Sequence, residues 1–299
     1  MSVLEIKNLT KSFGDKAVLR GLSLSVPEHS VFGFIGRNGA GKTTTMKAVL
    51  GLLRPDGGEI FVEGEKVTHG QTKTNQLIGY LPDVPEFYGF MTAREYLSLC
   101  GESIGMSRAE IRKRSEELLS LVGLAEEKHR VRGYSRGMKQ RLGIAQALFA
   151  RPKLLICDEP TSALDPVGRK DILDVLLAAR EQTTVLFSTH ILSDAERICT
   201  DIAFLNDGKI AMQGTVAELK KLHRKEEFSL ELAGAEYITA VTEKFPIAKI
   251  SGKETLSISG GENEMHALLA FIAEKKIPFT KIERAEPTLE ALFMEVAAK

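Results

Sequence analysis

A glycine-rich segment that follows an apolar run has the residue types and the spacing to hold a polyphosphate. Residues 36–43 read Gly-Arg-Asn-Gly-Ala-Gly-Lys-Thr, the spacing GxxxxGK followed by Ser or Thr, between the run 31–35 and a helical segment. The glycines let backbone N–H groups turn inward, and the start of the helix attracts negative charge. Lys42 can reach the β- and γ-phosphates, and Thr43 can place its hydroxyl on Mg²⁺. We expect a nucleotide to contact Gly36, Asn38, Gly39, Ala40, Gly41, Lys42, Thr43 and Thr44.

Two adjacent acids at the end of the apolar run 154–157 are the second candidate for chemistry. An uncompensated carboxylate at the end of a buried strand is unfavourable, and a magnesium ion would compensate it. We expect Asp158 to hold Mg²⁺, directly or through water, and Glu159 to orient or deprotonate an attacking water. A solvated strand end is the alternative for this run alone. The phosphate loop favours the catalytic interpretation, because the loop would bind the phosphates while the two acids would hold the metal ion and the attacking water.

A histidine follows the apolar run 183–188. His190 could contact the γ-phosphate or position Glu159. A lone histidine is more often a satisfied structural residue, and that alternative stays open for His190 taken alone.

The elements around these residues indicate an α/β fold. Asp165 suits the N-cap of a helix and Pro166 its first position, and the apolar residues that follow recur at helical spacing. Asn206-Asp207-Gly208 is typical of a hairpin turn. We expect strands at 3–6, 23–26, 31–35, 153–157 and 183–188, a hairpin of 202–205 with 209–212, and helices at about 42–52 and within 90–150.

A charged stretch without apolar periodicity, 220–227, marks a domain boundary. We expect a nucleotide-binding domain at 1–220 and a small accessory α+β domain at 225–299. The accessory domain is predicted to have strands at 228–232, 256–258 and 279–282, and helices at about 237–245, 265–275 and from Thr288 onward.

The bulk composition excludes several classes of function. Lys plus Arg and Asp plus Glu are both 40, and aromatic residues are 6% with no Trp, so neither a basic field nor a base-stacking surface points to nucleic acid. Three scattered cysteines form no CxxC pair, which argues against a zinc site. No apolar run is long enough to cross a bilayer, and the first residues lack a signal peptide. We therefore expect a soluble, cytoplasmic protein, so that any membrane pathway belongs to another chain.

Further segments, in order along about residues 1–220, give the chain a strong resemblance to the nucleotide-binding subunits of ABC transporters. Residues 134–141 look like the family signature, 162–165 like its D-loop and 78–83 like its Q-loop. His190 takes the switch-histidine position, and Phe13 stands where the family places an adenine-stacking aromatic. The resemblance implies a P-loop NTPase core with an antiparallel β subdomain and a helical subdomain at about 90–150. It also implies hydrolysis of ATP with Mg²⁺, and Lys42, Glu159 and His190 as the catalytic residues.

The signature segment predicts a second anion site. Ser135 can N-cap a helix through Gln140, and the exposed start of that helix attracts anions. By resemblance this site serves the ATP of a second ATPase subunit, identical or not, in a head-to-tail dimer. Ser135, Gly137 and Asp165 are the expected contacts.

Two positions depart from the family pattern. Arg136 stands where the signature usually has Gly, although Ser135 and Gly137 are retained. Asp83 stands at the Q-loop position in place of Gln. Its oxygen can still ligate Mg²⁺ or a water on it, while adding a negative charge. The alternative for Asp83 is an ordinary turn acid between Pro82 and Pro85.

The remaining features concern the type of system. Residues 287–296 are similar to the tail of exporter subunits of the drug, sodium and polysaccharide type, which pair the ATPase with a separate integral membrane permease. Phe87, Tyr88, Phe90 and Met91 could form a docking patch for that permease or be buried in the helical subdomain. We expect a transporter ATPase at the inner face of the cell membrane. The alternatives are a soluble ABC ATPase acting on ribosomes or DNA, and an ATP-binding regulatory subunit with weak hydrolysis.

Overall fold

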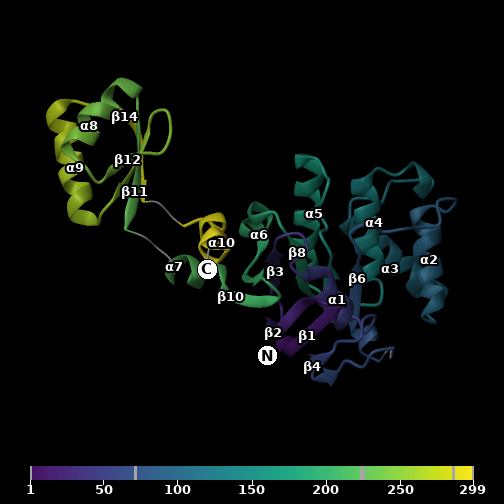
Figure 1. Ribbon diagram of the computed structural model, residues 1–299. Coiled ribbons are helices and arrows are strands. Elements are labelled where there is room, and N and C mark those ends of the chain that lie inside the picture. The colour runs from purple at the N-terminus through teal and green to yellow at the C-terminus, as the bar shows by residue number, and fades with distance from the viewer. Residues whose placement is uncertain (1, 71–72, 223–225, 285–286, 298–299) are drawn as a thin grey trace. The chain divides into compact units, whose positions relative to one another are not determined.

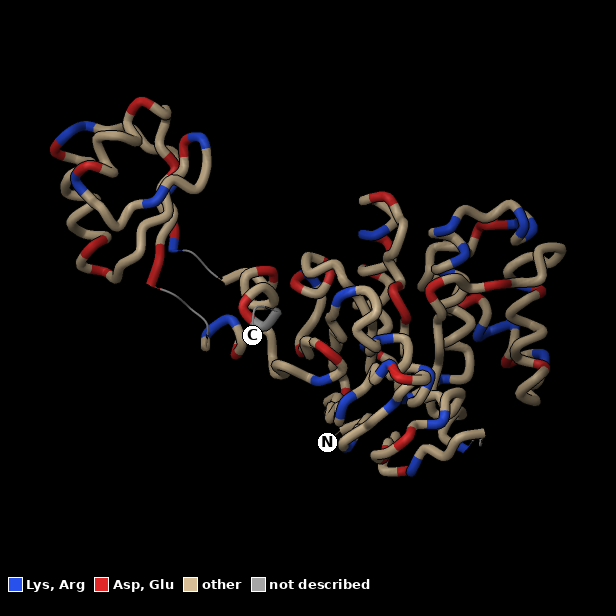
Figure 2. Tube along the Cα trace, viewed as in Figure 1, with Lys and Arg blue, Asp and Glu red and all other residues tan. Residues whose placement is uncertain are grey.

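The computed structural model describes residues 2–70, 73–222, 226–284 and 287–297, which form two compact units (Figure 1). The first unit contains residues 1–217 together with the segment that begins at Phe293, and the second contains residues 218–292. Along both units, basic and acidic residues are interspersed (Figure 2). In the described part of the chain, no helix has the length and apolar content to span a membrane.

A six-stranded sheet forms the centre of the first unit. Five strands run parallel in the order β9-β3-β8-β7-β6, and β10 pairs antiparallel with β9. Every residue of β3, β7 and β8 is buried, as expected for parallel strands that are covered on both faces. The bounds are β3 Val31–Gly36, β6 Ile78–Leu81, β7 Leu154–Cys157, β8 Thr184–Thr189, β9 Asp201–Asn206 and β10 Lys209–Thr215.

The parallel pairing brings four strand ends to one edge of this sheet. Ile35 pairs with Thr189, Phe187 with Cys157, and Cys157 with Leu81. The segments that follow β3, β8, β7 and β6 therefore lie together. They carry the phosphate loop, His190, the acid pair and Asp83, respectively. Ligands of open parallel sheets bind at this carboxyl edge.

An antiparallel sheet in the order β2-β1-β4-β5 covers one side of the first unit, as the fold prediction requires. Leu4 and Leu22 of this sheet share a buried core with Phe32 of β3 and Met46 of α1. Helix α1 ends at Val49, earlier than the predicted 52, because Gly51 adopts a left-handed conformation and the Leu52 N–H bonds back to Lys47. The bounds are β1 Ser2–Phe13, β2 Lys16–Pro27, β4 Gly57–Val62, β5 Glu65–Lys66 and α1 Lys42–Val49.

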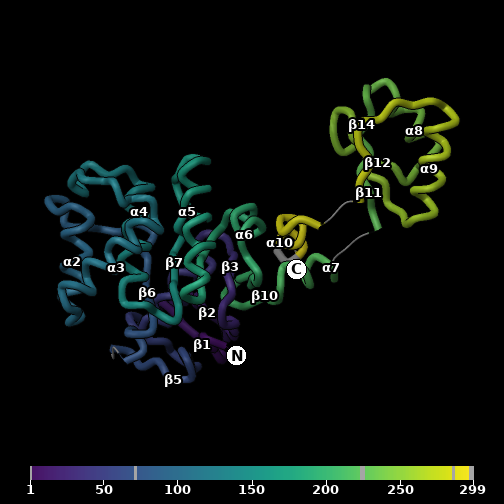
Figure 3. The backbone as a smooth tube through the Cα atoms, turned by 180° about the vertical axis from the view of Figure 1, so that it is seen from behind, coloured from purple at the N-terminus to yellow at the C-terminus, as the bar shows by residue number. Residues whose placement is uncertain are grey.

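Three helices, α2, α3 and α4, lie side by side and form the helical part of this unit (Figures 1 and 3). Capping boxes fix the starts of α2 (Thr92 with Glu95) and α3 (Ser107 with Glu110). Gly79 lets β6 approach α4 closely, since a Cβ there would lie 2.2 Å from the Ala147 carbonyl oxygen. The bounds are α2 Ala93–Ser103, α3 Arg108–Leu121, α4 Arg136–Leu148, α5 Pro166–Ala179, α6 Leu192–Ile198, α7 Val216–Leu222, and the 3₁₀ turns η1 Thr74–Leu77 and η2 Val131–Gly133.

The second unit contains an antiparallel sheet in the order β12-β13-β11-β14 together with helices α8 and α9. Phe228, Leu230, Leu256 and Ile272 are part of its buried core. The bounds are β11 Glu227–Leu232, η3 Ala235–Tyr237, α8 Ile238–Lys244, β12 Ala248–Ile250, β13 Thr255–Ser259, α9 Glu262–Lys275 and β14 Phe279–Arg284. The last helix, α10 (Leu289–Ala297), carries Phe293, whose ring centroid lies 5.6 Å from that of Phe204 in β9.

Candidate functional site

The side chain of Lys42 forms hydrogen bonds with the backbone of the phosphate loop. Lys42 is buried, and its Nζ donates to the carbonyl oxygens of Gly36 at 2.7 Å and Arg37 at 3.3 Å. Gly41 precedes α1 at φ 112°, and a Cβ there would lie 2.8 Å from Leu19 Cδ2. Only glycine allows both this conformation and this close approach. The loop therefore turns around a buried positive charge at the start of a helix, an arrangement that suits a polyphosphate.

Glu159 connects the loop lysine to the histidine. Its Oε1 forms an ion pair with Lys42 Nζ at 3.0 Å, and its Oε2 lies 2.8 Å from His190 Nδ1. Glu159 also has φ 49°, a left-handed conformation that non-glycine residues rarely adopt and that occurs often at functional sites. The three predicted catalytic side chains therefore form one chain of contacts, with the carboxylate in the middle.

Asp158 is held by two hydroxyl groups. Thr43 Oγ1 and Ser188 Oγ each donate to one of its carboxylate oxygens at 2.7 Å. The Ser188 oxygen also accepts from the Glu159 N–H at 2.9 Å. Ser188 is completely buried and thus links both members of the acid pair to β8. The sequence placed Ser188 only at the end of an apolar run. The available signal was a polar residue at the carboxyl end of a buried parallel strand.

The oxygen ligands at this point fit a magnesium ion. Thr43 and Asp158 are adjacent, and a hydroxyl with a carboxylate is the hard-oxygen set that Mg²⁺ prefers. The ion usually takes one or two protein carboxylates and completes its shell with substrate phosphates and water. Burial raises the pKa of the Tyr80 phenol to about 12, and the nearby charges of Asp158 and Asp83 add to that rise.

A cavity of about 550 Å³, the phosphate-loop cavity, collects most of the predicted residues. Asp158 is buried and does not line it. Lys16 and Val18 line it although the sequence did not single them out, and so does Ser162 of the segment that resembles the D-loop. Phe13 is half exposed at its rim, with Lys11 Nζ 5.5 Å from its ring centroid. The lining residues are Phe13, Lys16, Val18, Asn38, Gly39, Gly41, Lys42, Thr43, Thr44, Asp83, Glu159, Ser162 and His190.

Among the predicted nucleotide contacts, Gly36 and Ala40 of the phosphate loop do not line this cavity, and the remaining three lie outside it at helix starts. Ser135 caps α4 by accepting the Met138 N–H at 3.2 Å, and Asp165 caps α5 by accepting the Gly168 N–H at 3.2 Å. Both caps were predicted from the sequence. Gly137 follows in the first turn of α4, where an added Cβ would meet nothing closer than Leu164 at 3.8 Å. The start of α4 is thus open enough for an anion to approach.

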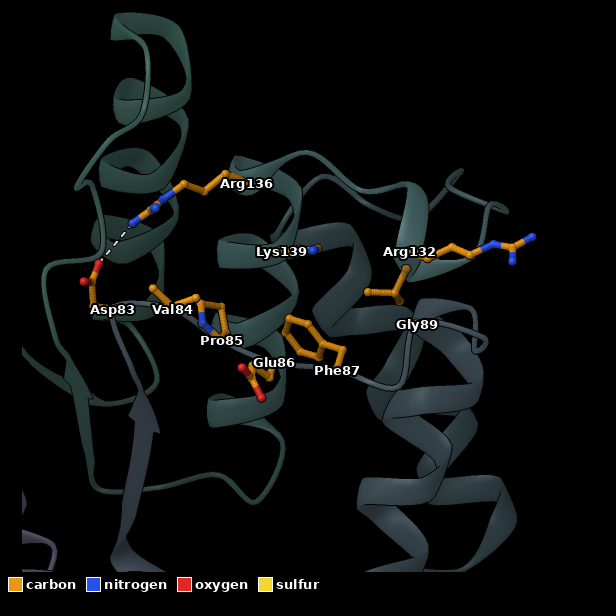
Figure 4. A pocket seen from close by; sticks show the side chains of 10 residues that line it. Asp83, Val84, Pro85, Glu86, Phe87, Gly89, Arg132, Arg136 and Lys139 are labelled. Atoms are coloured by element: carbon orange, nitrogen blue, oxygen red, sulfur yellow. Dashed lines mark hydrogen bonds and ion pairs between the residues drawn. The ribbon is translucent and has the colours of Figure 1, made fainter.

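A second cavity of about 440 Å³, the α4 cavity, lies beside α4 (Figure 4). Of the predicted aromatic cluster, Phe87 packs edge-on against Tyr96 with centroids 5.0 Å apart, whereas Tyr88 and Phe90 are 56% and 63% exposed. One ring is therefore structural, and two are available to a partner. The lining residues are Asp83, Val84, Pro85, Glu86, Phe87, Gly89, Val131, Arg132, Arg136 and Lys139.

The last helix contributes a residue beside the phosphate loop that the sequence analysis did not find. Phe293 lines a further cavity of about 430 Å³ together with Gly36, Asn38 and His190. Nothing in the local sequence indicates that the tail returns to this place.

Family models, curated relatives and solved structures that match this chain are ABC transporter ATP-binding proteins or domains. Residues 19–162 match the family model of the ABC transporter, and residues 214–297 match that of the C-terminal domain of ATP-binding proteins like DrrA1-3. An uncharacterised ABC transporter ATP-binding protein of Bacillus subtilis, YxlF, is 38% identical, with 98% of this chain and 99% of that protein covered.

Two further relatives are named for their systems. The bacitracin transport ATP-binding protein BcrA of Bacillus licheniformis is 34% identical, with 99% of this chain and 97% of that protein covered. The linearmycin resistance ATP-binding protein LnrL of Bacillus subtilis is 31% identical, with 99% of each covered.

Solved structures show the same fold. An ATP-binding subunit of an ABC transporter aligns with a TM-score of 0.66 at 32% identity, over 74% of this chain and 93% of that one. A dimeric, post-hydrolysis ATP-binding cassette, MJ0796 bound to ADP and Pi, aligns with a TM-score of 0.64 at 28% identity, over 71% of this chain and 98% of that one.

Proposed function

The chain belongs to the ABC transporter family as an ATP-binding, ATP-hydrolysing subunit, and from that premise we propose how its residues use ATP to drive a separate permease. The relatives named for bacitracin transport and linearmycin resistance support export as the direction. The chain then acts at the inner face of the cell membrane, attached through the permease.

The observation that carries the proposed mechanism is the contact chain from Lys42 through Glu159 to His190. When ATP is bound, Lys42 turns from Glu159 to the β- and γ-phosphates, which frees the carboxylate. Glu159 then accepts a proton from, or orients, the water that attacks the γ-phosphate, and His190 holds Glu159 in place. In the same cavity Phe13 stacks on the adenine, and the loop N–H groups hold the phosphates.

Thr43 and Asp158 would hold Mg²⁺; Asp83, which the sequence analysis also expected as a ligand, lines the same cavity but its carboxylate is paired with Arg136. When bound, the ion neutralises charge on the β- and γ-phosphates. The protein holds the carboxylate of Asp158 for that purpose through Ser188 and Thr43. Asp158 is already oriented, so little rearrangement is needed on binding.

A second copy or a similar subunit completes each ATP site in the proposed dimer. The start of α4, with Ser135 and Gly137, and the start of α5, with Asp165, offer helix N-termini to the ATP held by the partner. ATP thus holds two subunits together, and hydrolysis lets them separate. The dimeric form of MJ0796 supports this arrangement for the fold.

The α4 cavity is the proposed docking place of the permease. Its apolar side includes Val84, Phe87 and Val131, and the exposed rings of Tyr88 and Phe90 follow in the same segment. Exposed apolar clusters of this kind mark protein contacts. Co-purification of the permease with the chain, and its loss when Tyr88 and Phe90 are both replaced by Ser, would test the assignment. Retention by that double variant would argue against it.

Replacement of Glu159 tests the hydrolytic role. Glu159→Gln keeps the size of the side chain but replaces one carboxylate oxygen by an NH₂ group and cannot accept the proton, so we expect ATP binding to persist and phosphate release to fall by roughly 10²-fold or more. Glu59→Gln, at an exposed ion pair with Lys66, is the matched control and should leave phosphate release unchanged. Normal phosphate release by Glu159→Gln would remove Glu159 from the role.

A further inference from the structure

The two positions at which the chain departs from the ABC pattern contact each other. Arg136 Nη2 lies 3.1 Å from Asp83 Oδ1, across 53 positions of sequence (Figure 4). The Arg136 side chain is 42% exposed and that of Asp83 is 48% exposed. An acid in place of Gln and a base in place of Gly thus form an ion pair.

A second contact fixes the same aspartate to the same helix. Gln140 lies one turn after Arg136 on one face of α4, is completely buried, and donates from Nε2 to the Asp83 carbonyl oxygen at 2.6 Å. Helix α4 therefore holds Asp83 by its backbone through Gln140 and by its carboxylate through Arg136. With the backbone fixed, the direction of the carboxylate depends on Arg136.

Asp83 is the residue that the two cavities share. It lines both the phosphate-loop cavity and the α4 cavity, whereas Arg136 lines only the α4 cavity. The phosphate-loop cavity already contains the Glu159 carboxylate and must accept a triphosphate. An unpaired charge on Asp83 would repel that triphosphate, which a neutral glutamine does not. Of the two residues of the pair, Asp83 alone lines the phosphate-loop cavity of this chain.

We propose that Asp83 and Arg136 form a matched pair in which Arg136 is a positioning residue: it neutralises the Asp83 carboxylate and turns it toward the α4 cavity, so that an acidic Q-loop remains compatible with ATP. The inference rests on the proposed function. Arg136 directly follows Ser135, so the pair also joins the wall of this chain's cavity to the helix start proposed for the partner's ATP.

The expected size follows from the exposure of the pair. Half-exposed ion pairs contribute only about 0.2–1 kcal/mol, which corresponds to roughly 1.4- to 5-fold in an equilibrium constant. Because this effect is small, the effect of replacing Arg136 must be compared between a chain with Asp83 and a chain in which Asp83 has been replaced. If Arg136 acts through Asp83, its replacement matters only while Asp83 is present.

The experiment measures ATP affinity, in EDTA and in Mg²⁺, for Arg136→Ala in the wild-type and Asp83→Gln backgrounds. We expect Arg136→Ala to weaken ATP binding roughly 2- to 5-fold with Asp83 and less than about 1.5-fold with Gln at that position. Arg136→Lys, which keeps the charge, should restore most of the affinity. The EDTA series reports on charge alone and does not depend on turnover.

A second ion pair provides the control. Arg197 and Asp174 are also 3.1 Å apart and similarly exposed, on α6 and α5. Arg197→Ala should leave ATP affinity unchanged in both backgrounds. An equal effect of Arg136→Ala with and without Asp83 would overturn the inference, while a wild-type chain that fails to bind ATP would instead overturn the proposed function.

Discussion

Replacement of Ser188 by Ala isolates the residue that joins the acid pair to β8. The substitution removes a hydrogen bond donated to the Asp158 carboxylate and one accepted from the Glu159 N–H. A bond to a charged group is worth about 1.5–3 kcal/mol and a neutral one about 0.5–1.5 kcal/mol. Because Ser188 is completely buried, we expect the variant to lose about 2–4.5 kcal/mol of unfolding free energy.

The same change should slow hydrolysis. With Ser188 gone, the carboxylates of Asp158 and Glu159 are less well fixed, and each 1.4 kcal/mol of lost orientation lowers turnover about tenfold. Denaturant unfolding and steady-state phosphate release, both on the purified chain, measure the two effects.

A second buried serine serves as a control for the general effect of losing a buried hydroxyl group. Ser30 is also buried, but its hydroxyl donates only to the Pro27 carbonyl oxygen at 2.7 Å. Ser30→Ala should lose about 0.5–1.5 kcal/mol and keep normal turnover. If Ser188→Ala is no less stable than Ser30→Ala and hydrolyses ATP at the wild-type rate, the link through Ser188 is wrong.

Two further predictions concern packing and pH. Gly79→Ala should lower stability by about 1–3 kcal/mol or more in thermal unfolding, because the new Cβ meets the Ala147 backbone, whereas Gly133→Ala, with no atom within 4 Å, should be nearly neutral. Equal melting temperatures would refute the close approach of β6 and α4. Burial raises the Tyr80 pKa to about 12 from an ordinary value near 10, so its stabilising contribution is full below pH 10 and is lost as the pH rises toward 12. In an absorbance titration, the tyrosine that ionises at the highest pH should be missing from Tyr80→Phe. An unchanged titration curve would contradict the assignment.

Contiguous signals made much of the fold and the site predictable from the sequence. The phosphate loop, the acids after 154–157 and the N-cap of Asp165 each depend on residues close in the chain, and the structure has a loop, strand ends and a helix start there. Local rules were sufficient because glycine conformations, capping and burial are decided within a few residues.

Features that depend on distant pairing were not predictable. The role of Ser188 depends on the register of β8 against β7, and the contact of Arg136 with Asp83 depends on the packing of α4 against β6. The return of Phe293 to Phe204 likewise has no local signal. Short helices such as α7 have too few turns to show an apolar period, so the sequence predicts residues 220–222 as part of a charged boundary.

Shared ATP sites between two subunits can be tested by mixing two inactive variants. Lys42→Ala damages a chain's own phosphate loop, and Ser135→Arg damages what that chain offers its partner. In a mixed dimer, one of the two sites has both an intact Lys42 and an intact Ser135. Random pairing makes about half of the dimers mixed, so phosphate release should reach up to about a quarter of the wild-type value. Recovery of activity on mixing, with each variant inactive alone, is the expected result. No recovery, although both variants fold and the Ser135→Arg chain still binds ATP, would contradict ATP hydrolysis at a site built from two subunits.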